Sequence, residues 1–86
     1  MGRYRVFVKP SAVDEIEVIP EKKQRQRIVA KIEALSDDAR PAGCEKLSGR
    51  EHYRLRQGVY RIVYAIEDDR LVVYVVKVGH RSSVYR

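Results

Sequence analysis

The stretch HYRLRQGVYRIVYAIEDDRLVVYVVKV, residues 52–78, decides the fold. Its β-branched and aromatic residues form three runs, which are separated by the pairs Gln57-Gly58 and Asp68-Asp69. Such runs, joined by short connections, predict strands in consecutive hairpins. The three predicted strands are residues 52–56, 59–67 and 70–78. The C-terminal half is therefore expected to be an antiparallel meander.

Two-residue loops predict the register of both hairpins. Arg54 then lies opposite Arg61, and Val63 lies opposite Tyr74. Side chains alternate between the two faces of a sheet. One face is therefore expected to gather the residues that would seat the helices: Tyr53, Leu55, Tyr60, Ile62, Tyr64, Ile66, Leu71, Val73 and Val75. The other is expected to gather His52, Arg54, Arg56, Arg61, Val63, Tyr74, Val76, Val78 and His80.

The N-terminal segment predicts a strand followed by a short helix. Residues 3–10, RYRVFVKP, alternate in polarity and are expected to form a strand that ends at Pro10. Residues 11–19 have apolar side chains at helical spacing, with Ser11 in a suitable position for an N-cap. This helix is expected to stop before Pro20.

Residues 21–39 have the clearest helical pattern in the chain. Ile28, Ile32 and Leu35 recur at helical spacing and predict one buried face, with Val29 beside it. The basic residues around that face predict a solvated surface or, alternatively, contacts with the backbone of a nucleic acid. Residues 36–51 are rich in turn formers and are expected to form a loop.

These elements predict an α+β fold in the order β-α-α-β-β-β. We expect a small antiparallel four-stranded sheet with an N-terminal helical hairpin packed on one face. A length of 86 residues suits one domain, here residues 1–86, with no room for a separate cofactor domain.

The net charge of +6 and the pI of about 9.7 indicate a polyanionic partner. No predicted element remains to cover the face that carries Arg54, Arg56 and Arg61. Because a guanidinium matches a phosphate with two parallel hydrogen bonds, this face is expected to bind phosphate. The alternative is that these arginines form surface salt bridges with neighbouring glutamates: Glu45, Glu51 or Glu67.

Several classes of chemistry are not expected. Cys44 is the single cysteine, which excludes an internal disulfide and favours a reducing cytoplasm. No signal peptide or membrane span is expected. The predicted register separates His52 from His80 by roughly 20 Å, at about 3.3 Å per residue, so the two cannot act on one phosphate. No pattern predicts a metal site, a cofactor or a Ser-His-Asp set.

The segment YRLRQGVYRIVYAIEDDRLVVYVVKVGHRSSVYR, residues 53–86, resembles the RelE toxins of the RelE/ParE superfamily of toxin–antitoxin systems. EKLSG at residues 45–49 and the strand–helix–helix start fit the same family. The resemblance implies a microbial-RNase-like fold with two helices on one face of the sheet. It also implies a metal-independent endoribonuclease that cleaves messenger RNA in the ribosomal decoding site, by attack of the ribose 2′-hydroxyl on the adjacent phosphate.

The resemblance implies catalytic roles for Arg61, Arg81 and Tyr85. An arginine stays protonated and can neutralise the charge that develops on a pentacovalent phosphorane. Tyr85 is a candidate either to stack on a base or to take the 2′-hydroxyl proton; the alternative is a C-terminal aromatic without a role. His80 is a candidate acid for the 5′-hydroxyl leaving group, or else a polar residue at the end of a strand.

The resemblance implies RNA-binding roles for Lys46, Arg54 and Arg56. Better-known members carry lysines where this chain has Arg54 and Arg56. The charge is kept, but an arginine cannot replace a lysine that must give up a proton.

The implied partners are a cognate acidic antitoxin and the ribosome with messenger RNA in its decoding site. The antitoxin is expected to lie on the uncovered face, over Val63, Tyr74, Val76 and Val78. Two other functions stay open for the same fold: a ParE-type toxin that inhibits gyrase without nuclease chemistry, and a non-catalytic module that binds RNA or the ribosome.

Overall fold

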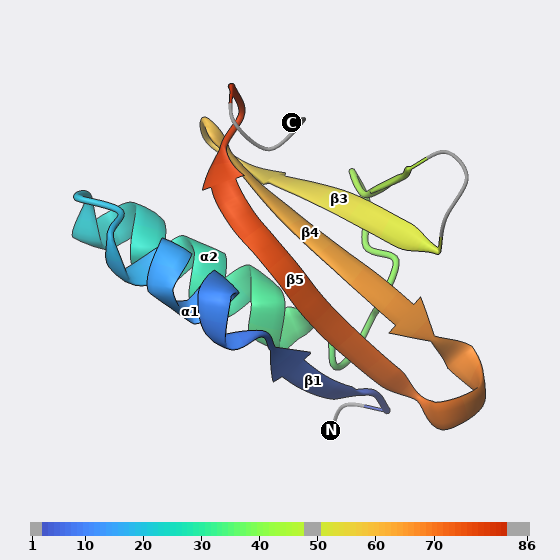
Figure 1. Cartoon of the computed structure of the whole chain (residues 1–86). Helices are drawn as coiled ribbons and strands as arrows, with labels where there is room; N and C mark the ends of the chain where they lie inside the picture. Colours follow the sequence, from blue (N-terminus) through green and yellow to red (C-terminus); the bar gives the residue numbers. More distant parts are fainter. Residues whose placement is uncertain (1–2, 48–50, 83–86) are drawn as a thin grey trace.

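A sheet with two helices on one face makes up the computed structural model, which describes residues 3–47 and 51–82 (Figure 1). In the described part of the chain, five strands lie in the order β1-β5-β4-β3-β2. The elements are β1 (Arg5–Val8), α1 (Pro10–Glu17), α2 (Lys22–Ala34), β2 (Glu45–Lys46), β3 (His52–Gln57), β4 (Tyr60–Glu67), a 3-10 helix (Asp68–Arg70) and β5 (Val72–His80). The α+β class and the order of the main elements confirm the expectation.

The sheet differs from the expected one in the number and direction of its strands. Glu45 and Lys46, which were expected in a loop, form a fifth strand by pairing antiparallel with Arg54 and Tyr53 of β3. In addition, β1 runs parallel to β5, with Arg5 level with Val72, so the sheet is mixed. The two helices and the loop after them lie between β1 at one edge and β2 at the other, and the meander then leads back until β5 lies beside β1.

The loop between β3 and β4 is Gly58-Val59, one residue later than expected, because Gln57 pairs with Tyr60. Gly58 has a φ of +60°, which suits glycine at the first position of a two-residue hairpin loop. The pairing is therefore shifted by two residues, and Arg61 lies opposite Arg56 rather than Arg54. A shift of two leaves the side chains of β3 and β4 on their expected faces.

The second connection is also longer than the expected Asp68-Asp69 loop, so Tyr74 lies opposite Ala65 rather than Val63. Leu71, expected on the face that seats the helices, is 37 % exposed and lies outside the core.

A β-bulge changes the second half of β5. Tyr64 pairs with Val75, but the next pair joins Val63 to Lys77, so Val76 is an extra residue. Beyond the bulge the alternation is reversed. Val78 faces the helices and is 1 % exposed, and His80 pairs with Tyr60. The expectation that Val78 and His80 share a face with the arginines was therefore wrong.

Both helices cover the apolar face of the sheet (Figure 1). Helix α1 begins at Pro10, which occupies its first turn, rather than after an N-cap at Ser11. In α2, Ile28, Ile32 and the adjoining Leu35 are buried, as their spacing predicted. The core also contains Ala12, Ile16, Ile19, Ala39, Tyr53, Leu55, Tyr60, Ile62, Tyr64, Ile66, Val73, Val75 and Val78.

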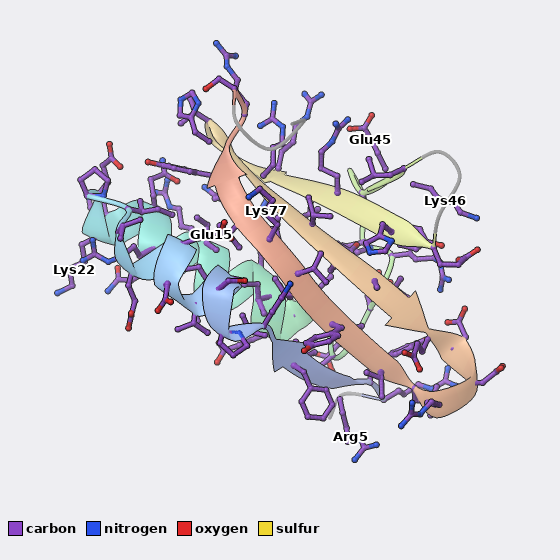
Figure 2. All side chains as sticks on the ribbon, viewed as in Figure 1. Arg5, Glu15, Lys22, Glu45, Lys46 and Lys77 are labelled. Atoms are coloured by element: carbon purple, nitrogen blue, oxygen red, sulfur yellow. The ribbon has the colours of Figure 1, made fainter. Side chains whose placement is uncertain are left out.

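Helix α1 also fixes the free edge of β5 beyond the end of β1. Glu15 accepts a hydrogen bond from the backbone N–H of Val78 at 2.9 Å and pairs with the Lys77 ammonium at 3.1 Å. Figure 2 shows these two side chains side by side between α1 and β5. This contact holds the strand just before the end at which the candidate site lies.

Candidate functional site

Four arginines gather where β5 ends beside the β3–β4 turn, and we call Arg54, Arg56, Arg61 and Arg81 the arginine cluster. Arg54 and Arg56 are on β3, and Arg61 faces Arg56 from β4. Arg81 follows β5, and its backbone N–H donates to the carbonyl of Val59 at 2.8 Å. Hairpin pairing and this hydrogen bond thus bring together the four arginines that the sequence singled out.

Among the described residues, Glu45 is the acidic group in contact with the arginine cluster. From β2, its carboxylate lies 2.8 Å from the guanidinium of Arg54 and 3.8 Å from that of Arg56. The hydrogen bond and charge of Arg54, then the charges of Arg56 and Arg61, lower the pKa of Glu45. Salt bridges were the alternative interpretation of these arginines, and they are confirmed for Arg54 and Arg56. Figure 2 shows Glu45 beside β3, far from the helices.

Arg61 is the buried member of the arginine cluster, only 8 % exposed. One of its terminal amino groups donates to the carbonyl of Tyr60 at 3.2 Å, and its Nε has no hydrogen-bond partner. Burial, followed by the charges of Arg56, Arg54 and Arg81, lowers the pKa of Arg61. Within the described residues, no carboxylate lies at ion-pair distance from its guanidinium. A buried cation among like charges is costly, and an anionic ligand would offset that cost.

The other predicted site residues lie in different surroundings. Lys46 is exposed on β2 and forms an ion pair with Glu51 at 3.1 Å. His80 lies in edge-to-face contact with Tyr60, their ring centroids 6.1 Å apart, and Tyr60 belongs to the apolar face. Tyr85 lies outside the described residues. The structure therefore groups the four arginines and places His80 on the opposite side of the sheet.

The two histidines are well separated, as the sequence predicted. His52 is level with Ala65 and His80 is level with Tyr60, a spacing of five residues, or roughly 17 Å at ~3.3 Å per residue. They also lie on opposite faces, because His52 shares the face of Arg54. The described residues contain no group of three or more His, Cys, Asp or Glu side chains arranged to hold a metal ion.

The central position of Glu45 was not expected from the sequence. Glu45 was predicted to lie in a loop, as one of several possible salt-bridge partners of the arginines. Residues 45–46 pair with β3 as a strand of two residues, and so short a strand shows no pattern in the sequence that could have located Glu45.

No helix in the described part of the chain is long and apolar enough to cross a membrane.

Replacing Glu45 by Gln should strengthen the binding of short RNA about threefold at low salt. The substitution removes the charge that neutralises Arg54 and Arg56, so one more phosphate can be neutralised and the salt dependence steepens by about one unit. Fluorescence anisotropy with a non-cleavable oligonucleotide measures both quantities. Glu33→Gln, which removes the same charge from the exposed surface of α2, is the matched control. Equal binding by both variants would show that Glu45 does not compete with phosphate.

A family model and a curated protein are similar to this chain in sequence. A family model described as "ParE toxin of type II toxin-antitoxin system, parDE" matches residues 3–85. Toxin RelG of Mycobacterium tuberculosis is 38 % identical over 34 residues, which are 40 % of this chain and 39 % of that relative. The matched segment thus spans well under half of the curated relative.

Solved structures match over nearly the whole chain. RelE in the archaeal RelE–RelB complex from Pyrococcus horikoshii has a TM-score of 0.83 and 25 % identity, over 95 % of this chain and 99 % of that one. The isolated RelE toxin of E. coli has a TM-score of 0.76 and 28 % identity, over 95 % and 90 % of the two chains. The fold of this chain is therefore that of the RelE toxins.

Proposed function

The chain belongs to the ParE toxin family of type II toxin–antitoxin systems, within the RelE/ParE superfamily, and from this premise we propose that it is a toxin that cleaves messenger RNA on the ribosome. The proposed reaction is attack of a ribose 2′-oxygen on the adjacent phosphorus. The bond to the 5′-oxygen breaks, and the products are a 2′,3′-cyclic phosphate and a free 5′-hydroxyl. Inhibition of translation and arrest of growth follow from it.

The burial of Arg61 among three further arginines is the observation that carries this proposal. Two negative charges develop on the equatorial oxygens of the phosphorane, and a fixed guanidinium stabilises them without reorganisation. Arg61 is held by its strand and its surroundings before substrate arrives. Among the described residues the charge of Glu45 acts on Arg61 from beyond ion-pair distance, and a phosphate would supply an anion in direct contact with its guanidinium.

The remaining arginines suit binding of the RNA strand on either side of the reacting phosphate. Arg56 and Arg81 are exposed, and Arg54 lies beneath Glu45 with a side chain only 12 % exposed. We assign Arg54, Arg56 and Lys46 to RNA binding, and Arg61 and Arg81 to charge stabilisation. A phosphate that displaces Glu45 would gain contacts with both Arg54 and Arg56.

Proton transfer needs one group to take the 2′-hydroxyl proton and one to protonate the 5′-oxygen. Tyr85 is our candidate for the first, a role that requires cationic neighbours to stabilise its phenolate. His80 is a weaker candidate for the second than the sequence suggested, since it packs on Tyr60 on the opposite side of the sheet from Arg61. Water would then protonate the leaving oxygen.

We also propose an acidic antitoxin as partner, because the structural relatives include RelE–RelB complexes. The apolar strip expected to receive it is smaller than predicted. Val63 is 8 % exposed and Val78 faces the helices, so Tyr74 and the half-buried Val76 remain. Opposite charge on the two partners would make association fast and sensitive to salt.

Brief expression of the chain without an antitoxin tests the proposed function. We expect growth to stop and primer extension to reveal new 5′ ends inside translated messages. The ParE-type alternative is favoured by the name of the matching family model, and it predicts intact messages with trapped gyrase–DNA complexes. Arrest with neither signature would indicate a binding module without nuclease chemistry.

A further inference from the structure

A basic and aromatic patch lies on the same sheet face as the arginine cluster, at the opposite end of the sheet. Phe7 of β1 is level with Tyr74 of β5. Both rings point away from the helices, because the residues on either side of each pack into or against the core. Phe7 is 48 % exposed and Tyr74 is 44 % exposed. Two large aromatic rings thus lie side by side in contact with solvent.

Cationic side chains flank this aromatic pair. The guanidinium of Arg5 lies 5.8 Å from the centre of the Phe7 ring, and Figure 2 shows Arg5 at the β1 end of the sheet. Arg70 forms an ion pair with Glu67 at 3.4 Å, with both side chains more than half exposed. An exposed ion pair of this kind contributes little, so Arg70 can exchange its carboxylate for a phosphate.

A shallow pocket of about 410 Å³ lies between these groups, and its lining includes Arg5, Phe7, Glu67, Arg70, Val72 and Tyr74. Its volume falls within the range of small-molecule sites. Apart from Glu67, which pairs with Arg70, its composition suits a single-strand binding surface, on which bases stack on aromatic rings and guanidinium planes while cations contact the backbone.

The position of the patch connects it to the proposed reaction site. Tyr74 is level with Ala65, which is four residues from Arg61 along β4. That is roughly 13 Å at ~3.3 Å per residue, or about four nucleotides at the ~3.4 Å rise of a stacked strand. Val63 lies between Arg61 and Ala65 on the same face of β4. A single strand lying along this face would reach both sites.

We propose that Phe7 and Tyr74 form a base-stacking subsite for single-stranded RNA whose phosphates occupy the arginine cluster. The proposal deepens the proposed function and rests on it. Continuity with the phosphate-directed cluster favours RNA over a peptide as the occupant, since both ends of the face carry guanidinium groups beside apolar surface. The subsite would hold the strand a few nucleotides from the reacting phosphate and would contribute to the choice of site.

Binding of non-cleavable probes of two lengths tests this subsite. We would measure anisotropy of fluorescein-labelled 2′-O-methyl oligouridines of about three and about eight nucleotides, since only the longer can span both sites. We expect the unaltered protein to bind the longer probe at least about tenfold more tightly. The double variant Phe7→Leu, Tyr74→Leu should lose that gain and bind the short probe normally. Tyr74→Phe, which keeps the ring, is the matched control and should retain the gain.

The outcomes separate the subsite from the proposed function. Unchanged binding of the longer probe by the double variant would overturn the subsite and leave a protein partner as the occupant of the patch. Arg61→Met tests the arginine cluster in the same assay. If this substitution left the affinity for both probes unchanged, and the longer probe still bound more tightly through the aromatic rings, the arginine cluster would be overturned as the phosphate site. Photo-crosslinking with 5-iodouridine gives an independent readout. Crosslinks are expected at Phe7 or Tyr74, and their confinement to other residues would also overturn the subsite.

Discussion

Arg61→Met should lower the rate of message cleavage on ribosomes about 10²–10³-fold, the usual effect of removing one preorganised charge or donor from a transition state. The same variant should be at least as stable as the unaltered protein. Arg61 is buried beside three like charges, and its removal relieves their repulsion. Met has a similar length and no charge to desolvate. Loss of activity without loss of stability would identify Arg61 as a functional residue.

Arg61→Lys is the informative control for this prediction. Arg61→Lys keeps the positive charge and loses the planar fork of donors, so its cleavage rate should lie between those of the unaltered protein and Arg61→Met. Single-turnover cleavage on programmed ribosomes and urea unfolding measure the two properties separately. If Arg61→Met cleaved at close to the normal rate, the arginine cluster would be a binding surface and the reaction would depend on other groups.

The face on which the arginines lie could be predicted from the sequence because faces depend only on odd and even positions. The loop between β3 and β4 was placed one residue early, which shifted the pairing by two and left Arg54, Arg56 and Arg61 on the correct face. An error in the partner of Arg61 therefore had no effect on the site. This tolerance is general for hairpins whose two strands alternate cleanly.

The bulge in β5 could not be predicted because the sequence around it does not alternate. LVVYVVKV, residues 71–78, offers an apolar side chain to either face at most positions, so a reversal after Val75 leaves no mark in the pattern. Its consequence is large, because it moves Val78 into the core and His80 to the side of Tyr60. The strand β2 escaped prediction for a different reason: two residues cannot show a period.

The burial of Arg61 is a property of the assembled site and has no local signature. Its neighbours in sequence, Tyr60 and Ile62, belong to the core on the other face, and the charges around it come from β3 and from the residue after β5. A sequence pattern gives the charge and the face of a residue. It does not give the depth at which neighbouring side chains enclose it.

In contrast to Arg61→Met, a truncation on the apolar face should lower stability and spare activity. Ile28→Ala should destabilise the fold by about 3 kcal/mol and leave cleavage per folded molecule unchanged. Ile28 is fully buried between α2 and the sheet, and truncation there combines lost transfer free energy with a cavity. A domain of 86 residues has a total stability of roughly 4–13 kcal/mol. The loss should therefore appear as a large fall in the urea midpoint.

Val29→Ala is the matched control, because Val29 is the next residue of α2 and is 42 % exposed. Its truncation should change stability by no more than about 0.5 kcal/mol. If both truncations cost the same, α2 would pack on the sheet differently from the structure described above. If Ile28→Ala instead slowed cleavage by the folded protein, the two faces would be coupled. The expected pair of results, stability lost at Ile28 and activity lost at Arg61, would show that one face of the sheet serves folding and the other serves RNA.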